Sequence, residues 1–282
     1  MQPTTRPDPI DYLLIGHIAR DLTPDGSKLG GTAAYAALTA HALGLRVGVV
    51  TSWGDEFPLG PLSKISIANT PTDNSTTFEN IYTSEGRLQI IHHVAPSLDF
   101  DMIPESWRDA PIVHLGPIAQ EVAPTLTRRF PHSLVGVTPQ GWLRTWDGNG
   151  RVHPSKWSEA SLVLKYASAA VISVEDVAED EERIKEMAAA SRIFVVTEGA
   201  NGSRLYWNGD VRRFRALEVT EVNATGAGDI YAAAFFAWLH KTSDPWEAAR
   251  FATQLAARSA TRSGLRGVPN IEEVQNAMRE VL

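Results

Sequence analysis

The sequence predicts an α/β fold in which helices flank a central, mostly parallel β-sheet and a small second sheet lies outside it. Two observations lead to this prediction. Short apolar segments typical of buried strands alternate with helical segments along most of the chain, as expected for a parallel sheet with crossover helices. The alternation stops at residues 74–95, where the pattern indicates two short strands joined by a tight turn.

The first part of the chain is expected to form a strand, a helix and a second strand. Residues 11–16 (DYLLIG) are an apolar run that ends at a glycine, and residues 46–55 (RVGVVTSWGD) are a second buried strand that runs into a loop. Between them, residues 29–44 start with a Gly-Gly turn and continue as an alanine-rich helix. Gly44 is well placed to end this helix, because glycine readily adopts the left-handed conformation found after helix C-termini.

The two strands of residues 74–95 are expected to join at Ser84-Glu85-Gly86. Residues 18–29 and 74–94 are predicted to build a small β lid on a single domain of residues 1–282. Residues 1–9 contain three prolines and are expected to form a flexible tail.

The rest of the chain returns to alternating strands and helices. A hairpin is expected to turn at Asn208-Gly209, a dipeptide typical of tight hairpin turns. We expect strands at 111–116, 133–138, 169–174 and 192–198, the hairpin at 202–216, and helices at 121–130, 159–168, 178–190, 228–241, 245–262 and 270–281.

Composition narrows the class of protein. Of the 282 residues, 43% are hydrophobic and 21% are charged, which is ordinary for a globular chain with a large core. The net charge of −7 and the lack of a basic stripe argue against nucleic acid as a partner, and the apolar runs are too short for a membrane span. Without cysteine, disulfides and thiolate chemistry are excluded. The N-terminus lacks a signal-peptide pattern, and we expect a cytoplasmic protein.

The most informative segment is Asn223-Ala224-Thr225-Gly226-Ala227-Gly228-Asp229, which leads into the apolar run IYAAAFFAWLH. The two glycines let the backbone approach a ligand closely. The first amides of the following helix have no intrahelical partner, and this end of the helix is positive, so it suits a phosphate. A carboxylate at Asp229 would repel that phosphate unless it has a task, such as taking the proton of a hydroxyl that attacks the phosphate. The segment therefore indicates phosphoryl transfer to an alcohol.

Two other interpretations of the segment are open at this point. Aspartate is common in the first turn of any helix, and glycine-rich turns often precede helices. A dinucleotide-binding fingerprint fits less well, because Tyr231 stands where the third glycine should be.

Over its full length from about residue 11, the chain resembles the ribokinase-like (PfkB) family of carbohydrate kinases. The resemblance is carried by Asp21 after the first strand, Gly30-Gly31 at the first helix, residues 197–202 (TEGANG) and residues 224–229 (ATGAGD), followed by a pair of C-terminal helices. The family implies a three-layer fold with a mostly parallel sheet, flanking helices and a small β lid.

Within the family the chain looks most like the myo-inositol kinase branch. Residues 16–21 (GHIARD), 30–35 (GGTAAY) and 140–144 (QGWLR) carry this resemblance, and Tyr35 stands where many members have asparagine. The resemblance implies an ATP-dependent kinase for a hydroxyl of a cyclitol or sugar, with myo-inositol as the best candidate and with ATP and Mg²⁺ as cofactors.

The resemblance also implies roles for individual residues. Asp229 would be the general base, and the amides of Gly226, Ala227 and Gly228 would form an anion hole around the transferring phosphoryl group. Asp21 would accept hydrogen bonds from substrate hydroxyls, Gly30 and Gly31 would allow close approach and lid movement, and further substrate contacts would come from Tyr35, Gln140 and Arg144. The nucleotide would lie against Thr197, Gly199, Gly202, Thr225, Gln254 and Ala257.

The chain departs from the family pattern in two places. Asn223 and Ala224 stand where an aspartate and a small hydroxyl residue or proline are usual. The family's Asn-x-x-Glu motif, which is linked to Mg²⁺ and phosphate, best matches residues 173–176 (SVED), where Asp176 is the candidate metal-binding residue. Mg²⁺ is therefore expected to arrive with ATP, held mostly by phosphates and water.

Several alternatives stay open. The alternative substrates are ribose, 2-keto-3-deoxygluconate, fructose or a nucleoside such as adenosine, whose base Phe78 and Tyr82 would clamp. A non-catalytic sugar or nucleotide sensor is a further alternative. Asp21 would otherwise cap a turn, Arg144 would form a surface ion pair, and Trp142 and Trp146 would either stack on a ring or serve the core. Adjacent His92 and His93 should point to opposite faces of a strand and so not share a metal. The chain is expected to be a monomer, or a homodimer paired through its lid.

Overall fold

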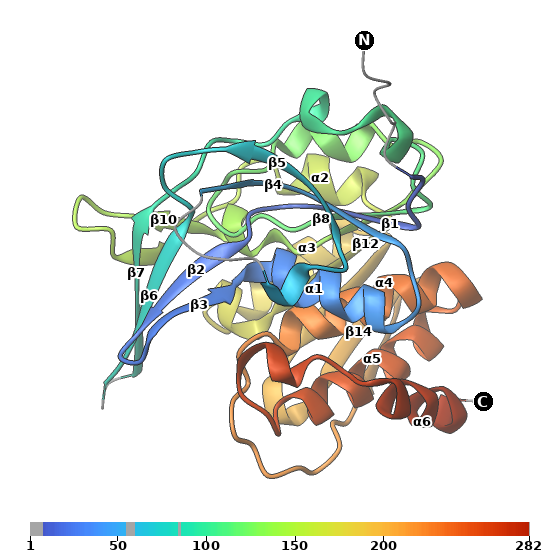
Figure 1. The fold of residues 1–282 in the computed structure, drawn as a ribbon. Coiled ribbons are helices and arrows are strands. Elements are labelled where there is room, and N and C mark those ends of the chain that lie inside the picture. The colour runs from blue at the N-terminus through green and yellow to red at the C-terminus, as the bar shows by residue number, and fades with distance from the viewer. Residues whose placement is uncertain (1–7, 55–59, 84–85, 282) are drawn as a thin grey trace.

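The computed structural model describes residues 8–54, 60–83 and 86–281. A nine-stranded sheet lies between two layers of helices (Figure 1). Its strand order is β15-β14-β13-β12-β9-β8-β1-β4-β5, and neighbouring strands from β13 to β5 run parallel whereas β14 and β15 are antiparallel. The three-layer α/β architecture predicted from the sequence is confirmed.

The strands of this sheet include every one that the sequence predicts for it. They are β1 (Tyr12–Ile15), β4 (Val47–Trp53), β5 (Ser66–Pro71), β8 (Ile112–Leu115), β9 (Leu134–Val137), β12 (Ala169–Ser173), β13 (Ile193–Thr197), β14 (Ser203–Trp207) and β15 (Asp210–Phe214). The turn between β14 and β15 falls at Asn208 and Gly209, both of which have positive φ angles, as expected.

The two faces of the sheet bury two separate clusters of apolar side chains. One face packs on α1 (Gly31–Ala42), α4 (Ala227–Thr242), α5 (Pro245–Ser259) and α6 (Ile271–Val281), and the other on α2 (Ala160–Tyr166) and α3 (Glu181–Ala190). Because successive residues of a strand point to opposite faces, Tyr12 and Leu14 belong to the first cluster, and Leu13 and Ile15 belong to the second.

Helix α4 is apolar on all sides because it lies in the middle of its layer. It packs against α1 and α5 as well as the sheet, and its residues from Ile230 to Phe236 are fully or almost fully buried. The Phe236 ring sits directly over β9, where a side chain at Gly136 would come within 2.6 Å of it. This packing fixes the N-terminus of α4, where Asp229 lies.

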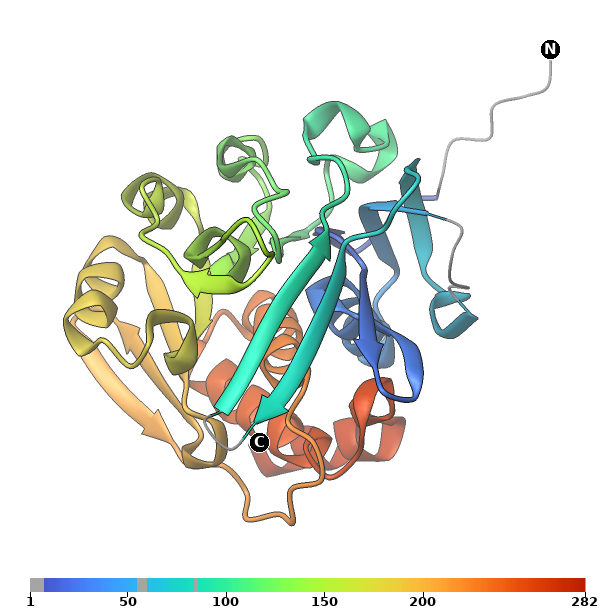
Figure 2. The same cartoon turned by 90° about the vertical axis from the view of Figure 1, so that its left-hand side faces the viewer.

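A second, four-stranded sheet stands at the side of the main body (Figures 1 and 2). It consists of β2 (Ala19–Thr23), β3 (Gly26–Gly30), β6 (Thr77–Thr83) and β7 (Gly86–His93), in the order β3-β2-β6-β7. We call it the small sheet. The turn expected at Ser84 and Glu85, and residues 1–7 of the expected tail, lie outside the described residues.

Three elements differ from the sequence prediction. The helix expected at 121–130 is wrong, because residues 124–128 form only a 3₁₀ turn that starts at Pro124, which has no N–H to donate to an α-helix. Strand β5 was not predicted because, as an edge strand, its residues are mixed and half exposed. The hairpin of β10 (Arg144–Trp146) and β11 (Val152–Pro154) was not predicted because each strand has only three residues.

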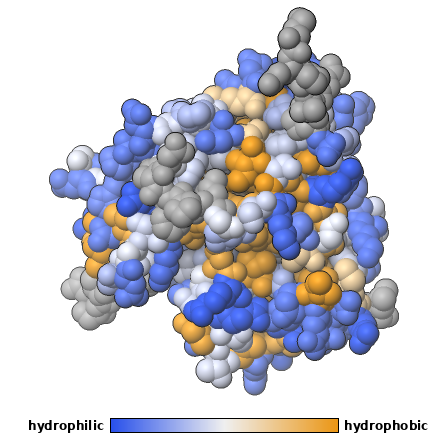
Figure 3. All heavy atoms as spheres, in the orientation of Figure 1, coloured by the Kyte–Doolittle hydropathy of each residue, from blue (hydrophilic) through white to orange (hydrophobic). Residues whose placement is uncertain are grey.

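Apolar side chains reach the surface in the middle of the molecule, over α1 and the neighbouring strands, where polar residues border them (Figure 3). Across the described ranges, no helix combines the length and the apolar character that a membrane crossing requires.

Candidate active site

A large cleft separates the small sheet from the carboxyl ends of the central strands. Its volume is about 1320 Å³, and its lining includes the residues at or just after the ends of β9, β12 and β13, namely Thr138, Ser173 and Thr197. Ligands of open α/β sheets usually bind at this edge. The small sheet contributes Asp21, Phe78, Asn80 and Gln89 to the opposite wall.

The cleft brings together most of the residues that the sequence singled out. Those that line it are Asp21, Gly31, Tyr35, Gln140, Arg144, Asp176, Thr197, Gly199, Gly202, Thr225, Gly226, Ala227, Gly228, Asp229 and Ala257. Gly30 lies just behind the wall, where a Cβ atom would come within 1.9 Å of an oxygen of Asp21. Gln254 is not among the residues that line the cleft, whereas Ala256 and Ala257 of the same helix α5 are, and its expected contact with the nucleotide stays a prediction.

The turn before α4 is held by short-range hydrogen bonds. The Asn223 side-chain oxygen accepts from the N–H of Thr225 at 2.8 Å, and the backbone amides of Val222 and Asn223 donate to the Ala260 carbonyl oxygen. Asparagine thus keeps the acceptor oxygen that an aspartate would supply here. The N–H of Ala227 donates to the Ala224 carbonyl oxygen at 3.1 Å, so this amide serves the turn, although the sequence assigns it to an anion.

Asp229 lies in the first turn of α4, with its side chain partly accessible from the cleft. The Thr32 hydroxyl, in the first turn of α1, donates to its Oδ1 at 2.7 Å. Burial raises the pKa of Asp229 to about 6, and the nearby carboxylates of Asp176 and Asp21 act in the same direction, while the Thr32 hydrogen bond and Arg144 oppose the increase. A carboxylate with a pKa near neutrality suits a general base.

Tyr35 packs against the turn from the α1 side. It is 3% exposed, and a Cβ atom at position 226 would lie 2.3 Å from its ring. Gly226 has a φ of +84°, so only glycine fits both the conformation and the contact. Burial raises the pKa of the Tyr35 hydroxyl well above its usual value, and the charges of Asp21 and Asp229 add to this. Tyr35 therefore lies near both carboxylates.

A buried network joins the main body to the small sheet. The ring of His17 bonds with the Thr76 hydroxyl at 2.7 Å and with the Pro96 carbonyl oxygen at 3.0 Å, so one side chain connects the start of β2 to the segments before β6 and after β7. The carboxylate of Glu121 is 2% exposed and accepts from the amides of His17, Ile118 and Ala119. No sequence signal pointed to Glu121, because its partners are backbone groups.

The segment in place of the family's Asn-x-x-Glu motif forms a capping box. Asp176 Oδ2 accepts from the Ser173 amide at 2.8 Å, and the Ser173 hydroxyl accepts from the Glu175 amide. The other carboxylate oxygen accepts from Gln140 Nε2 at 3.1 Å. Within the described residues, no group of three or more His, Asp or Glu side chains is arranged to hold a metal ion. Asp176 and Glu175 both line the cleft here and offer the carboxylate oxygens that Mg²⁺ prefers as ligands.

The far end of the cleft combines glycine turns with apolar walls. Gly199 and Gly202 have positive φ angles, and a Cβ atom at Gly202 would lie 1.9 Å from the Phe214 carbonyl oxygen. Beneath this turn, Arg204 pairs with Glu198 at 2.7 Å and with Glu181 at 2.8 Å. Leu217, Val219 and Val222 line the cleft although they are exposed, and Ala256, Ala257 and Ala260 line it from α5 and its end.

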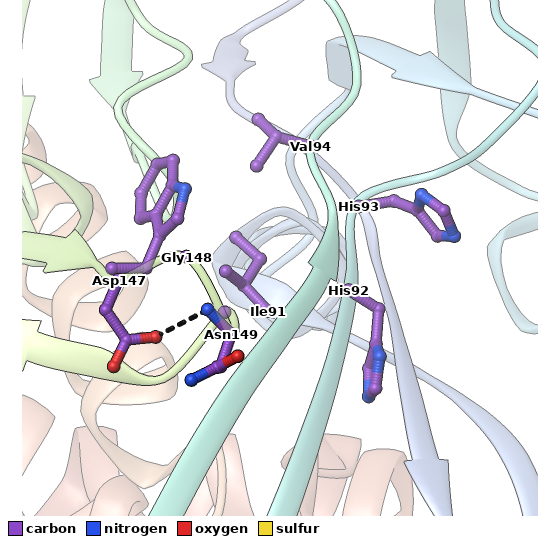
Figure 4. Close-up of a pocket in the computed structure, with 9 residues that line it drawn as sticks. Ile91, His92, His93, Val94, Asp147, Gly148 and Asn149 are labelled. Atoms are coloured by element: carbon purple, nitrogen blue, oxygen red, sulfur yellow. Dashed lines mark hydrogen bonds between the residues drawn. The ribbon is translucent and has the colours of Figure 1, made fainter.

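Three further candidates, Trp142, His92 and His93, do not line this cleft. Trp142 is buried and stacks on Trp157 at 5.2 Å, which gives it a place in the core. His92 and His93 border a separate, shallow groove between β7 and the β10–β11 hairpin (Figure 4). The expectation that they point to opposite faces is wrong: the register of β6 and β7 shifts here, and both imidazoles lie on the same side of the chain. His92 pairs with Glu79 at 2.9 Å.

The amino-acid sequence was compared with those of known protein families. The family profile described as pfkB family carbohydrate kinase matches residues 158–271, which include the turn before α4. Over this part of its length the chain is similar to the pfkB family of carbohydrate kinases. Together with its kinase relatives, this match shows a phosphotransferase with a hydroxyl acceptor.

Curated relatives of this chain act on different acceptors. A cytidine kinase from Thermococcus kodakarensis is 29% identical over 81% of this chain and 88% of the relative. An inositol 3-kinase from Oryza sativa subsp. japonica is 25% identical over 98% of this chain and 74% of the relative. A fructokinase from Escherichia coli is 25% identical over 81% and 84%.

Solved structures confirm the ribokinase-like fold. A pyrophosphate-dependent kinase of the ribokinase family, in complex with a pyrophosphate analog and myo-inositol, superimposes with a TM-score of 0.75 at 20% identity, covering 94% of this chain and 99% of that one. A ribokinase from Arabidopsis thaliana, in complex with ribose and ATP, gives 0.74 at 16% identity, covering 96% and 99%.

Proposed function

We propose that this pfkB-family kinase transfers the γ-phosphoryl group of MgATP to a hydroxyl of a cyclitol or sugar, with myo-inositol as the leading candidate. The observation that carries the proposal is the position of Asp229. Its carboxylate, with a pKa near 6, lies at the N-terminus of α4 in the same cleft as Asp21 on β2 and as Gln140 and Arg144 of the segment 140–144.

The proposed reaction is an in-line displacement at the γ-phosphorus. Asp229 accepts the proton of the acceptor hydroxyl while the hydroxyl oxygen forms a bond to phosphorus, and the bond from phosphorus to the bridging oxygen of ADP breaks. The negative charge on the transferring group is stabilised by the positive end of α4, by Arg144 and by the amides of Gly226 and Gly228. Ala227 is left out of this anion hole because its amide already donates to Ala224.

A nucleotide is the favoured phosphate donor, although one structural relative uses pyrophosphate. Pyrophosphate has no apolar part, whereas the far end of the cleft presents Leu217, Val219, Val222 and three alanines of residues 256–260. These side chains suit the faces of a purine or pyrimidine base. When bound with ATP, Mg²⁺ would neutralise phosphate charge, and Asp176 is the residue placed to hold it, directly or through water.

A polyol is the favoured acceptor because the end of the cleft that holds Asp21 and Asp229 is lined by charged and amide groups. Asp21 is suited to accept from hydroxyls, Arg144 to donate, and Gln140 to do either. The similarity to an inositol 3-kinase over nearly the whole chain points to a cyclitol. A nucleoside is the second candidate, because Phe78 also lines the cleft and the cytidine kinase is a relative.

Three further features belong to the same proposal. The small sheet would act as a lid that closes over the acceptor and excludes water, which otherwise competes for the phosphoryl group. The enzyme would act in the cytoplasm, where ATP is available. Its oligomeric state would be a monomer or a homodimer.

The deciding experiment measures product release by the purified protein over a matrix of donors and acceptors. The donors are MgATP and magnesium pyrophosphate, and the acceptors are myo-inositol, other inositols, ribose, fructose, 2-keto-3-deoxygluconate, adenosine and cytidine. ADP release that depends on an inositol supports the proposal in full. ADP release with another acceptor replaces the substrate and keeps the mechanism. Turnover with pyrophosphate alone refutes the donor assignment, and no turnover with any pair, despite ATP binding, favours a sensor.

A further inference from the structure

The hydrogen bond between Thr32 and Asp229 joins two helices at the point where the proposed reaction takes place. Thr32 is 2% exposed and lies in the first turn of α1, and its hydroxyl is 2.7 Å from Oδ1 of Asp229 in the first turn of α4. The two residues are 197 positions apart in the sequence. A buried hydroxyl aimed at a carboxylate is a costly arrangement unless the bond forms, so both partners are fixed by it.

The surroundings of Thr32 fix its rotamer. Its methyl group faces the loop after β8, where a Cβ atom at Gly116 would come within 2.8 Å of it. Gly31, just before it, has a φ of +79° and lies against the His17 carbonyl oxygen, which would be 2.9 Å from a Cβ atom at that position. With the methyl group and the backbone held in this way, the hydroxyl is directed to α4.

We propose that Thr32 is a positioning residue: its hydroxyl holds Oδ1 of Asp229 and thereby presents Oδ2 to the acceptor hydroxyl. The inference rests on the proposed function, in which Asp229 is the general base. A carboxylate on a freely rotating bond offers the acceptor either oxygen in many orientations, whereas proton transfer requires one oxygen within hydrogen-bond reach at a suitable angle. A second consequence is that the donated hydrogen bond favours the ionised form of Asp229.

Other charges also act on Asp229, so the effect of Thr32 must be separated from theirs. Asp21 on β2 and Asp176 after β12 raise the pKa of Asp229, Arg144 at the start of β10 lowers it, and the Tyr35 hydroxyl on α1 lies near it. Replacing any of these groups would also change contacts with the substrate. Thr32→Val removes only the hydroxyl and leaves all four groups in place.

The test compares the pH dependence of kcat/KM for the wild type, Thr32→Val, Thr32→Ser and Thr39→Val. Thr39 is a matched control, because it is fully buried on the same helix and its hydroxyl bonds only to the Tyr35 carbonyl oxygen. In Thr32→Val we expect the acidic limb of the kcat/KM profile to shift to higher pH by about one unit. At pH values above this limb, kcat should fall by about tenfold. Thr32→Ser and Thr39→Val should keep the wild-type position of the limb.

If the Thr32→Val variant still turns over and the acidic limb of its kcat/KM profile lies at the wild-type pH, the proposal is overturned. The kinase assignment then stays intact. If instead the wild type shows no turnover, the pKa of Asp229 is followed by ¹³C NMR of its carboxyl carbon, assigned by comparison with Asp229→Asn. A higher pKa in Thr32→Val than in Thr39→Val supports the hydrogen bond as the positioning device. Equal pKa values would refute it.

Discussion

The carboxyl group of Asp229 titrates near neutrality in the folded chain, because burial raises its pKa from the ordinary value of 3.8 to about 6. The folded state therefore binds this proton more tightly than the unfolded state does. The resulting contribution to the free energy of unfolding is fully present below pH 3.8 and is lost as pH rises through 6. At neutral pH the ionised group opposes folding, and only function gives a reason to keep it.

We accordingly expect Asp229→Asn to stabilise the protein while it stops the reaction. At about pH 8 the free energy of unfolding should rise by ~1–3 kcal/mol, since one pH unit corresponds to about 1.4 kcal/mol, and at about pH 4 it should change little. Urea denaturation over this pH range gives the measurement. Turnover should fall by about 10²–10⁴-fold, while ATP affinity, measured by calorimetry, stays close to that of the wild type.

Two outcomes would contradict this reading of Asp229. A stability gain that is the same at both ends of the pH range would mean that the ionised group is not the cause. A variant that turns over at the wild-type rate would mean that another group takes the proton.

At the scale of the element, the turn into α4 contains two glycines with different tasks. Gly226 has a φ of +84°, and a Cβ atom there would lie 2.3 Å from the Tyr35 ring. Gly228 is helical, and a Cβ atom there meets nothing within 4 Å. We expect Gly226→Ala to lower the free energy of unfolding by about 1–3 kcal/mol. Gly228→Ala, the matched control, should leave it unchanged or raise it by up to ~1 kcal/mol, because alanine favours the helix.

Chemical denaturation of both variants, with near-ultraviolet circular dichroism to follow Tyr35 and its neighbours, measures this difference. Equal stability of the two variants would show that the turn relaxes around a side chain at 226, and that the contact with Tyr35 does not constrain it.

The elements differ in how far the sequence revealed them. Except for β5, the strands of the central sheet were predictable, and runs such as Leu13–Ile15 are apolar on both faces. The turn before α4 was predictable because its glycines and Asp229 form a local motif. The contact from Thr32 to Asp229 was not, because it joins residues 197 positions apart. Gln254 does not line the cleft, and its nucleotide contact stays a prediction, since a helix register cannot be derived from a residue type. Pro124 was a visible signal against the helix expected at 121–130.

At the scale of the whole molecule, the small sheet and the catalytic cleft are linked through the β10–β11 hairpin. Ile90 of β7 pairs with Arg151 of the hairpin, and the Ile91 amide donates to the Gly150 carbonyl oxygen at 2.8 Å. The hairpin begins at Arg144, which lines the cleft and acts electrostatically on Asp229. We predict that a displacement of the small sheet is transmitted through this hairpin to a side chain beside the proposed base.

Gly150 is the residue through which the hairpin bonds to Ile91 of β7. Gly148, which is labelled in Figure 4, provides a control in the same loop. Gly150 has a φ of +77°, and a Cβ atom there would lie 2.3 Å from the Ile91 carbonyl oxygen, whereas one at Gly148 meets nothing within 4 Å. Gly150→Ala should therefore separate the hairpin from β7 and lower the free energy of unfolding by about 1–3 kcal/mol. Gly148→Ala should stay within ~0.5 kcal/mol of the wild type.

The kinetic consequence of Gly150→Ala distinguishes a linkage from a local defect. If the hairpin carries movement of the small sheet to Arg144, the variant should show a severalfold higher KM for the acceptor with little change in KM for ATP, because Arg144 lies at the acceptor end of the cleft and the nucleotide walls belong to other elements. Steady-state kinetics with each substrate varied in turn measures the two constants. The contrary result is an equal increase in the KM for the acceptor and the KM for ATP, or no change in either while stability falls. It would show that the hairpin only supports the fold and that the small sheet moves independently of the catalytic residues.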